Sequence, residues 1–200
     1  MSQITYAAMR ALVHPHVPGC PVPLIDEQLR SMARDFLRRS HVWNVDLDPV
    51  DVVANQTDYN IVNTAALTTA KGEVEAIVKV TLDGNVLNAG WDYNIGYDGT
   101  VLELVDTPPK AIEDGILMIA ACIPASDATG IESWIYNRWG EYIARGVAYK
   151  LQATIGKPYF NPDGSAFNRN EYMKGLEIAR IRENSGRMTG GIRVTPRPFI

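Results

Sequence analysis

The sequence predicts an α+β fold in which a helical body of three main helices carries an inserted, mostly antiparallel β-sheet lobe. Helical spacing of apolar residues in the first and last thirds of the chain predicts the body. Alternating apolar residues and Asp-Gly turns in the middle third predict the lobe. The last residues, GGIRVTPRPFI, hold two prolines that exclude a helix, so an extended C-terminal arm is expected.

The predicted boundaries follow these changes of pattern. Residues 1–49 and 125–185 form the helical body, residues 50–124 form the β lobe, and residues 186–200 form the arm. A chain of 200 residues is long enough to bury a sizeable core in such an arrangement.

The composition is that of a globular protein and excludes several function classes. Apolar residues make up 46% of the chain and charged residues 21%, which argues against a disordered chain. The net charge of −4 does not favour a general nucleic-acid-binding surface. Cys20 and Cys122 give no disulfide framework and favour free thiols in a reducing cytosol. The N-terminus lacks the pattern of a signal peptide, and the longest apolar run is too short to span a membrane.

The first predicted long helix covers residues 24–40, after a possible short helix and a proline-rich extended segment. An apolar face recurs at helical spacing along it, made of Ile25, Leu29, Met32, Ala33 and Phe36. Arg30, Arg34 and Arg38 fall on another face. A solvated surface is the leading interpretation of this arginine row, and contact with an acidic partner is the alternative.

The middle third is predicted to form the sheet. Apolar residues alternate strictly with more polar ones from Val74 to Leu82, which predicts a strand with one buried face. Asp83-Gly84 and Asp98-Gly99 are strong hairpin turn signals. Residues 115–123 are continuously apolar, as expected of a strand buried on both faces, and residues 50–62 are expected to add further strands.

The last third returns to helical patterns. A helix is predicted from an N-cap at Asp127 or Thr129 to Gly156, followed by a type I turn at 161–164. Its predicted apolar stripe comprises Ile131, Trp134, Ile135, Tyr142, Ile143, Val147 and Leu151. A second helix is predicted over 168–184, with apolar residues on several sides. Such a helix lies either at the centre of the monomer or against a neighbouring subunit.

Signatures of catalysis and metal binding are weak. His14, His16 and Cys20 could act as ligands, but no second pair completes a zinc site, and no metal is predicted. Phosphate-binding glycine motifs and a nucleophile elbow are absent from the sequence. We therefore predict no catalytic residues, no enzyme activity and no cofactor.

Three stretches carry a family resemblance: VPGCPVPLIDEQLRSMARDFLRRSHVW at 17–43, GKPYFNPDGSAFNRNEYMKG at 156–175 and IRVTPRPFI at 192–200. With the inserted sheet and its Asp-Gly turns, the chain resembles over nearly its whole length the head-to-tail adaptor, or connector, proteins of short-tailed bacteriophages, the family that includes tail tubular protein A. The resemblance implies a structural virion protein that forms a ring, usually of twelve copies, beneath the portal. Double-stranded DNA passes through such a ring into the tail nozzle without sequence-specific binding.

The resemblance, together with the chemistry of the residues, implies three sets of contacts. The expected partners are the portal protein, the tail nozzle protein and further copies of the chain. No membrane contact is expected, and the location is the head–tail interface of a virion made in the bacterial host cytoplasm. The portal-binding arm is predicted to use Ile192, Arg193, Val194, Arg197, Phe199 and Ile200; the subunit interface Tyr172, Met173, Leu176, Ile178 and Ile181; and the tail-facing tips Asp83, Gly84, Asn85, Asp98 and Gly99.

An alternative function is an enzyme or carbohydrate-binding module on a phage particle. It would use the aromatic-rich stretch 134–149 or the NPDG segment at 161–164. Trp134 and Trp139 fall inside an amphipathic helix, however, where packing is the commoner use of an aromatic side chain.

Overall fold

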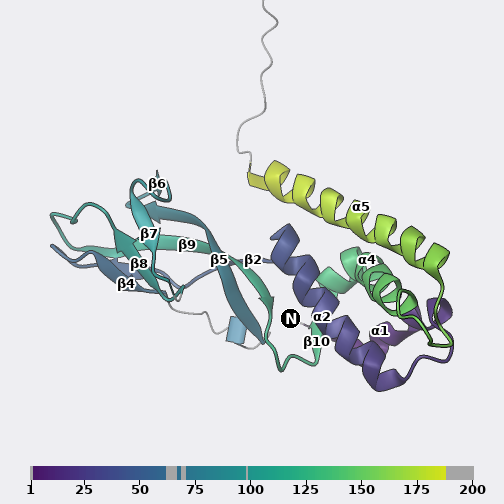
Figure 1. Cartoon of the computed structure of the whole chain (residues 1–200). Coiled ribbons are helices and arrows are strands. Elements are labelled where there is room, and N and C mark those ends of the chain that lie inside the picture. Colours follow the sequence, from purple (N-terminus) through teal and green to yellow (C-terminus); the bar gives the residue numbers. More distant parts are fainter. Residues whose placement is uncertain (1, 62–66, 69–70, 98, 188–200) are drawn as a thin grey trace, which may run out of the picture.

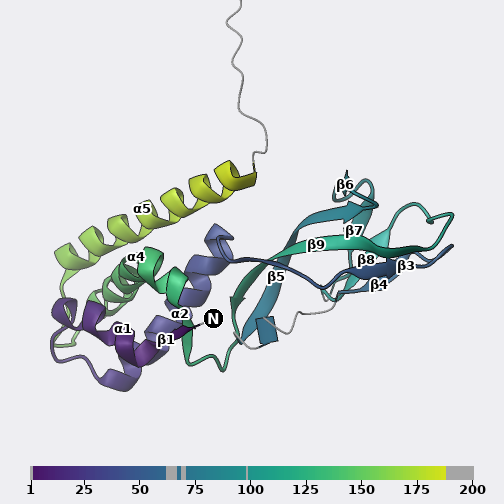
Figure 2. The same ribbon diagram turned by 180° about the vertical axis from the view of Figure 1, so that it is seen from behind.

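A computed structural model describes residues 2–61, 67–68, 71–97 and 99–187 of the chain. Of the predicted arm 186–200, residues 186–187 belong to a helix, and residues 188–200, like Asp98, lie outside the described residues. The molecule has a helical body, and an elongated β lobe extends from one side of it (Figures 1 and 2). The helices are α1 (Tyr6–Val13), the 3-10 helix η1 (His14–His16), α2 (Val22–Ser40), α4 (Ser133–Gln152) and α5 (Pro162–Arg187).

The strands form three antiparallel sheets among the described residues. A two-stranded sheet pairs β1 (Gln3–Thr5) with β10 (Gly130–Glu132) beside the helices. A five-stranded sheet is built around β9 (Ile112–Pro124), with β2 (Asn44–Asp46) and β3 (Val50–Val52) on one side and β5 (Gly72–Leu82) then β6 (Asn85–Leu87) on the other. A three-stranded sheet has the order β4 (Asp58–Asn60), β8 (Val101–Leu104), β7 (Tyr93–Ile95).

The chain is α+β, but the predicted body of three helices with a single sheet lobe is wrong. The described residues form four α-helices and several sheets. The fourth helix is α1, whose first turn is capped by the Thr5 hydroxyl, which accepts from the Ala8 N–H at 3.3 Å. Met9 and Val13 lie on the inner face of α1 and are buried. The β1–β10 sheet was missed because each of its strands has three residues, too few for a periodic pattern.

Helix α2 confirms the predicted long first helix and its apolar face. Ile25, Leu29 and Phe36 are fully buried among the other helices. Helix α4 lies at the centre of the body, against α1 and α2 on one side and α5 on the other (Figure 1). An aromatic cluster holds these helices together, since the ring of Phe36 lies 5.7 Å from that of Trp139 and 6.0 Å from that of Tyr172.

The starts of the two C-terminal helices differ from prediction. Helix α4 begins at Ser133 rather than at an Asp127 or Thr129 cap, because residues 130–132 pair with β1. Ile131 therefore belongs to a strand and not to the helical stripe. Helix α5 begins at Pro162, so the predicted turn at 161–164 is the start of a helix: the Asn161 side chain accepts from the Gly164 N–H at 2.9 Å.

Strands occur where they were predicted, but they belong to two sheets of the lobe rather than to one. Strand β9 lies at the centre of its sheet, and β3 and β4 fall within residues 50–62. The strict alternation predicted for 74–82 is not kept, because β5 carries register shifts between Val74 and Ala76 and between Ile77 and Lys79. Each extra residue turns the following side chains to the opposite face, so no single face of β5 stays buried along its length. Val80, which follows both shifts, is the fully buried residue of β5.

Candidate functional site

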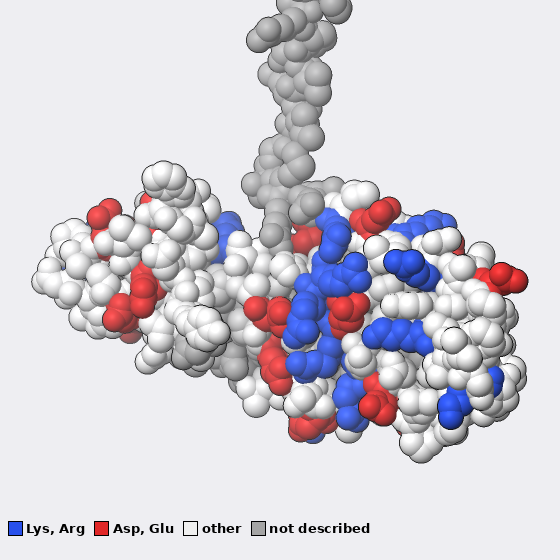
Figure 3. All heavy atoms as spheres, in the orientation of Figure 1, with Lys and Arg blue, Asp and Glu red and all other residues white. Residues whose placement is uncertain are grey.

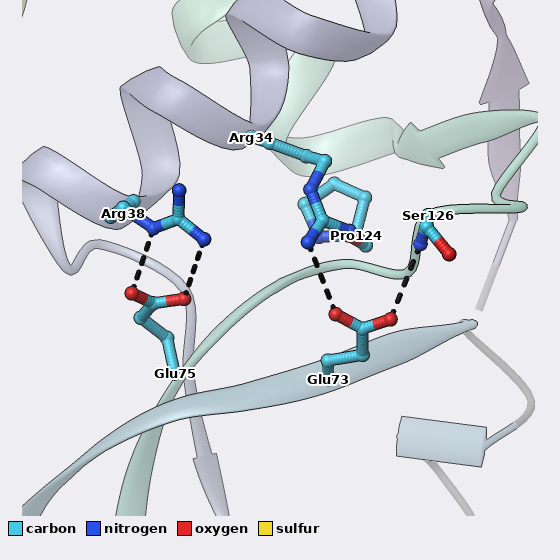
Figure 4. A network of polar contacts seen from close by, with 6 residues as sticks. All are labelled: Arg34, Arg38, Glu73, Glu75, Pro124 and Ser126. Carbon is cyan, nitrogen blue, oxygen red and sulfur yellow. Dashed lines mark hydrogen bonds and ion pairs between the residues drawn. The ribbon is translucent and has the colours of Figure 1, made fainter.

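The arginine row of α2 joins the helical body to the β lobe. Arg38 makes a bidentate contact with Glu75 of β5, with its Nε at 2.7 Å and its second nitrogen at 3.1 Å from the two carboxylate oxygens. Arg34 donates to the Pro124 carbonyl at the end of β9 and to Glu73 of β5 at 3.2 Å (Figure 4). The row is thus neither only a solvated surface nor a contact with a separate acidic partner, because Arg34 and Arg38 bind glutamates of the same chain.

Further contacts reinforce this junction, which we call the latch (Arg34, Arg38, Glu73 and Glu75). The second oxygen of Glu73 accepts from the Ser126 N–H at 3.2 Å (Figure 4). The hydrogen bond to Glu75 raises the pKa of Arg38 further above its ordinary value, so the guanidinium stays charged at any physiological pH. The latch thereby ties the lobe to α2 where β5 begins and β9 ends.

We expect the latch to contribute modestly to stability. Arg38→Ala should lower the free energy of unfolding by about 0.5–1 kcal/mol, because its ion pair is partly exposed. Arg34→Ala should cost about 1–2 kcal/mol, because it also leaves the Pro124 carbonyl without its charged donor. Denaturant titration measures both values. Arg30→Ala is the matched control, since Arg30 is exposed on the same helix; an equal loss there would contradict the latch.

Helix α5 presents apolar side chains outward from the body. The predicted interface residues Tyr172 and Leu176 are buried within the chain, and the Tyr172 hydroxyl donates to Asp35 of α2 at 2.5 Å. Burial, more than this hydrogen bond, raises the pKa of Tyr172. Met173, Ile178 and Ile181 of the same predicted set are 36%, 42% and 65% exposed. The structure thus separates the five residues into a packing side and a surface side.

A groove of about 160 Å³ lies between α4 and the C-terminal part of α5. Its lining residues are Val42, Trp134, Arg138, Trp139, Arg182 and Glu183. Glu183 accepts from the Asn44 side-chain amide at 2.6 Å, and the Trp134 indole donates to Glu132 at 2.6 Å. No ion pair of Arg138 or Arg182 occurs among the described residues. Sequence reasoning missed this groove because it joins residues about 140 positions apart.

The predicted tip at Asp83-Gly84 is a tight hairpin turn. Leu82 pairs with Asn85 across it, and both turn residues have positive φ, 50° for Asp83 and 80° for Gly84. Gly99 lies in the turn between β7 and β8, where its N–H donates to the Gly96 carbonyl at 2.8 Å. Each predicted turn therefore connects two paired strands: the first joins β5 to β6 in the five-stranded sheet, and the second joins β7 to β8 in the three-stranded sheet.

A third turn, which sequence reasoning missed, presents a tryptophan. Trp91 lies between β6 and β7 and is 83% exposed. The signal for it was present as Asn88-Ala89-Gly90 between two short apolar runs, because asparagine and glycine favour turns.

Opposite charges divide the molecule. Residues 44–124 hold 13 Asp and Glu against 3 Lys and Arg, a net charge of −10. The rest of the chain holds 10 acidic and 16 basic residues, a net charge of +6. Lysines and arginines gather over α2 and α5 on the face shown in Figure 3. The net charge of −4 is therefore the sum of an acidic segment that includes the lobe and a basic remainder of the chain.

The residues considered for metal binding form no group of three potential ligands among the described residues. His14 and His16 belong to η1, and within the described ranges no three His, Cys, Asp or Glu side chains gather closely enough to hold a metal ion. Cys20 and Cys122 are both buried free thiols. Burial raises the pKa of Cys20, and burial together with the charge of Glu132 raises the pKa of Cys122 to about 12.

We expect both thiols to resist modification in the folded protein. A thiol reagent at pH 8 should label native Cys122 at least about 100-fold more slowly than the unfolded chain, because the thiolate is scarce and shielded. Labelling should accelerate as the pH rises toward 12. Mass spectrometry of samples labelled with and without guanidinium measures this. Rapid native labelling of one equivalent would contradict the burial of both thiols.

The chain matches no protein-family model, and no curated protein matches it. Among the described helices, none has the length and apolar character needed to cross a membrane.

Proposed function

We propose that this chain is the head-to-tail adaptor of a short-tailed phage, a structural virion protein whose copies form a ring between the portal and the tail nozzle. The observation that carries the proposal is the two-part shape, in which a latch fixes a projecting lobe to a helical body (Figures 1 and 4). A connector needs separate surfaces for the structure above it, the structure below it and its neighbours in the ring. The family resemblance noted above supports the same function.

The proposed orientation directs the helical body and the terminal arm toward the portal and the lobe toward the tail. The tail-facing tips are then the turns at 83–85 and 98–99. Double-stranded DNA passes through the ring without sequence-specific contacts. The proposal involves no catalytic residue and no cofactor. The protein would be made in the host cytoplasm and reside at the head–tail interface of the virion.

The alternative of an enzyme or a carbohydrate-binding module has less support among the described residues. Trp139 is buried in the aromatic cluster, and so it offers no platform for a sugar. The segment at 161–164 is the beginning of α5 rather than a loop.

Native mass spectrometry tests the adaptor function directly. The chain alone and the chain mixed with the portal protein of its phage are compared. We expect a closed ring with the portal and at most weak association without it. A strictly monomeric chain in both samples would overturn the proposal.

Deleting residues 190–200 should weaken portal association by at least about 30-fold, the effect of losing an anchor worth about 2 kcal/mol. Helical content and melting temperature should stay nearly unchanged, because the body packs through residues before this segment. Surface plasmon resonance and circular dichroism measure the two effects.

A double variant, Arg193→Ala with Arg197→Ala, is the control for this deletion. It keeps the apolar residues and should lose less affinity than the deletion, because exposed charges contribute little. A truncated chain that melts earlier but binds the portal normally per folded molecule would remove the arm from the proposal.

A further inference from the structure

The turn that carries Trp91 is fixed by its own hydrogen bonds. One oxygen of the Asp92 carboxylate accepts from the Asn88 backbone N–H at 2.7 Å and from the Asn88 side-chain amide at 3.0 Å. The Trp91 and Asp92 N–H groups both donate to the Asn88 carbonyl, and Gly90 adopts a φ of 79°. This turn, residues 88–92, which we call the knob, therefore presents an exposed indole on an ordered backbone. Because the backbone of the knob is already ordered, binding through Trp91 loses little conformational entropy, which is a property of residues that anchor interfaces.

The surroundings of the knob are apolar and acidic. Val105, half exposed, donates its N–H to the Asp92 carbonyl at 3.0 Å and so lies beside the turn. Asp106 follows directly in the chain. Among the described lobe residues, only the carboxylates of Glu73 and Glu75, in the latch, form ion pairs. A surface that fits the knob must therefore combine a hollow for an indole with positive charge.

The groove between α4 and α5 has this combination. Val42 and Trp134 supply apolar walls, and Arg138 and Arg182 supply two guanidinium groups that lack ion-pair partners among the described residues. Both arginines are exposed. The Trp91 side chain is 83% exposed, so it does not occupy the groove of its own chain.

We propose that the knob of one copy docks into the Arg138–Arg182 groove of a second copy. Residues 44–124, which include the lobe, carry a net charge of −10 and the rest of the chain +6, so this contact brings opposite charges together. Two different surfaces meet, which is the heterologous arrangement that closes a ring when the rotation between copies permits. The inference rests on the proposed function and supplies the lateral contact of that ring.

Disulfide cross-linking between two single-cysteine variants tests the contact. Ala89→Cys chains, which keep Trp91, are mixed under mild oxidation with Ile178→Cys chains, which keep Arg138 and Arg182, while the native Cys20 and Cys122 stay buried. Ala89 is exposed in the knob, and Ile178 is exposed one helical turn before Arg182 on α5. We expect a mixed disulfide dimer. The control pair is Ala89→Cys with Lys157→Cys, because residue 157 lies before α5, at the far end of that helix from the groove. Equal yields from the two pairs would overturn the proposal, as would a cross-link formed only when both cysteines are in one chain.

Alanine and charge-reversal variants test the chemistry of the contact. Trp91→Ala should weaken self-association at low salt by at least about 10-fold, measured by sedimentation, because an anchoring aromatic is lost. Tyr97→Ala, which removes another exposed aromatic of the lobe, should leave it unchanged. Arg138→Glu should weaken it and Asp106→Arg in the same chain should restore part of it. No loss in Trp91→Ala, or no rescue by Asp106→Arg, would overturn the assignment.

These outcomes are separable from the test of the adaptor function, which uses the portal. A normal ring on the portal without the cross-link would leave the adaptor function standing and overturn the knob contact alone. A cross-link in a chain that never binds the portal would support the contact and overturn the adaptor function.

Discussion

Replacing Phe36 with alanine should lower the free energy of unfolding by about 3–5 kcal/mol, the usual cost of truncating a buried phenylalanine. Phe36 is fully buried on α2, and its ring contacts those of Trp139 on α4 and Tyr172 on α5. The truncation therefore opens a cavity where three helices meet. Equilibrium denaturation followed by circular dichroism measures the loss.

Phe167→Ala is the matched control for this substitution. Phe167 is 57% exposed on α5, and its ring lies 5.7 Å beneath the Arg145 guanidinium. We expect a loss of about 1 kcal/mol or less, because little apolar area and one cation–π contact are removed. Similar losses in the two variants would contradict the helix packing described above.

Replacing Gly175 with alanine should destabilise the protein by about 1–3 kcal/mol, the range typical of an overpacked core. A Cβ atom at this position would lie 2.3 Å from Cγ and 2.6 Å from Cβ of Tyr142, so α4 and α5 must move apart. Helix propensity alone predicts the opposite sign, because alanine is favoured over glycine by about 1 kcal/mol within a helix. Denaturant titration therefore decides between close packing and propensity.

A double-mutant cycle makes this prediction specific. The cost of Gly175→Ala should shrink when Tyr142→Ala removes the ring that blocks the new methyl group. The neighbouring exposed residue gives a control, since Lys174→Ala should change stability by no more than about 0.5 kcal/mol. A stabilised Gly175→Ala variant would show that the two helices do not approach closely here.

If the knob contact holds, the acidic lobe and the basic body act as complementary halves. The interface would then depend on salt, because exposed charges are screened within about 10 Å at 0.1 M ionic strength. The apolar contribution of Trp91 would persist at high salt. The latch and the knob contact would have different roles, since the first orients the lobe within one chain and the second uses that orientation between chains.

Local patterns in the sequence determined the elements whose side chains follow one period. The apolar face of α2 was predicted in full, since Ile25, Leu29 and Phe36 recur at helical spacing and are all buried. The turn at Asp83-Gly84 was predicted because its residues tolerate positive φ. These features depend on residues a few positions apart, which a single sequence displays.

Tertiary structure alone decided the partners of those elements. The arginine row had two local interpretations until β5 placed Glu75 beside Arg38, 37 positions along the chain. The register shifts in β5, the capture of residues 130–132 by β1 and the groove formed by Arg138 and Arg182 likewise depend on segments distant in sequence. Periodicity identifies which face of an element is apolar or charged. It carries no information on which distant surface that face meets, because that choice is made by the packing of the whole chain.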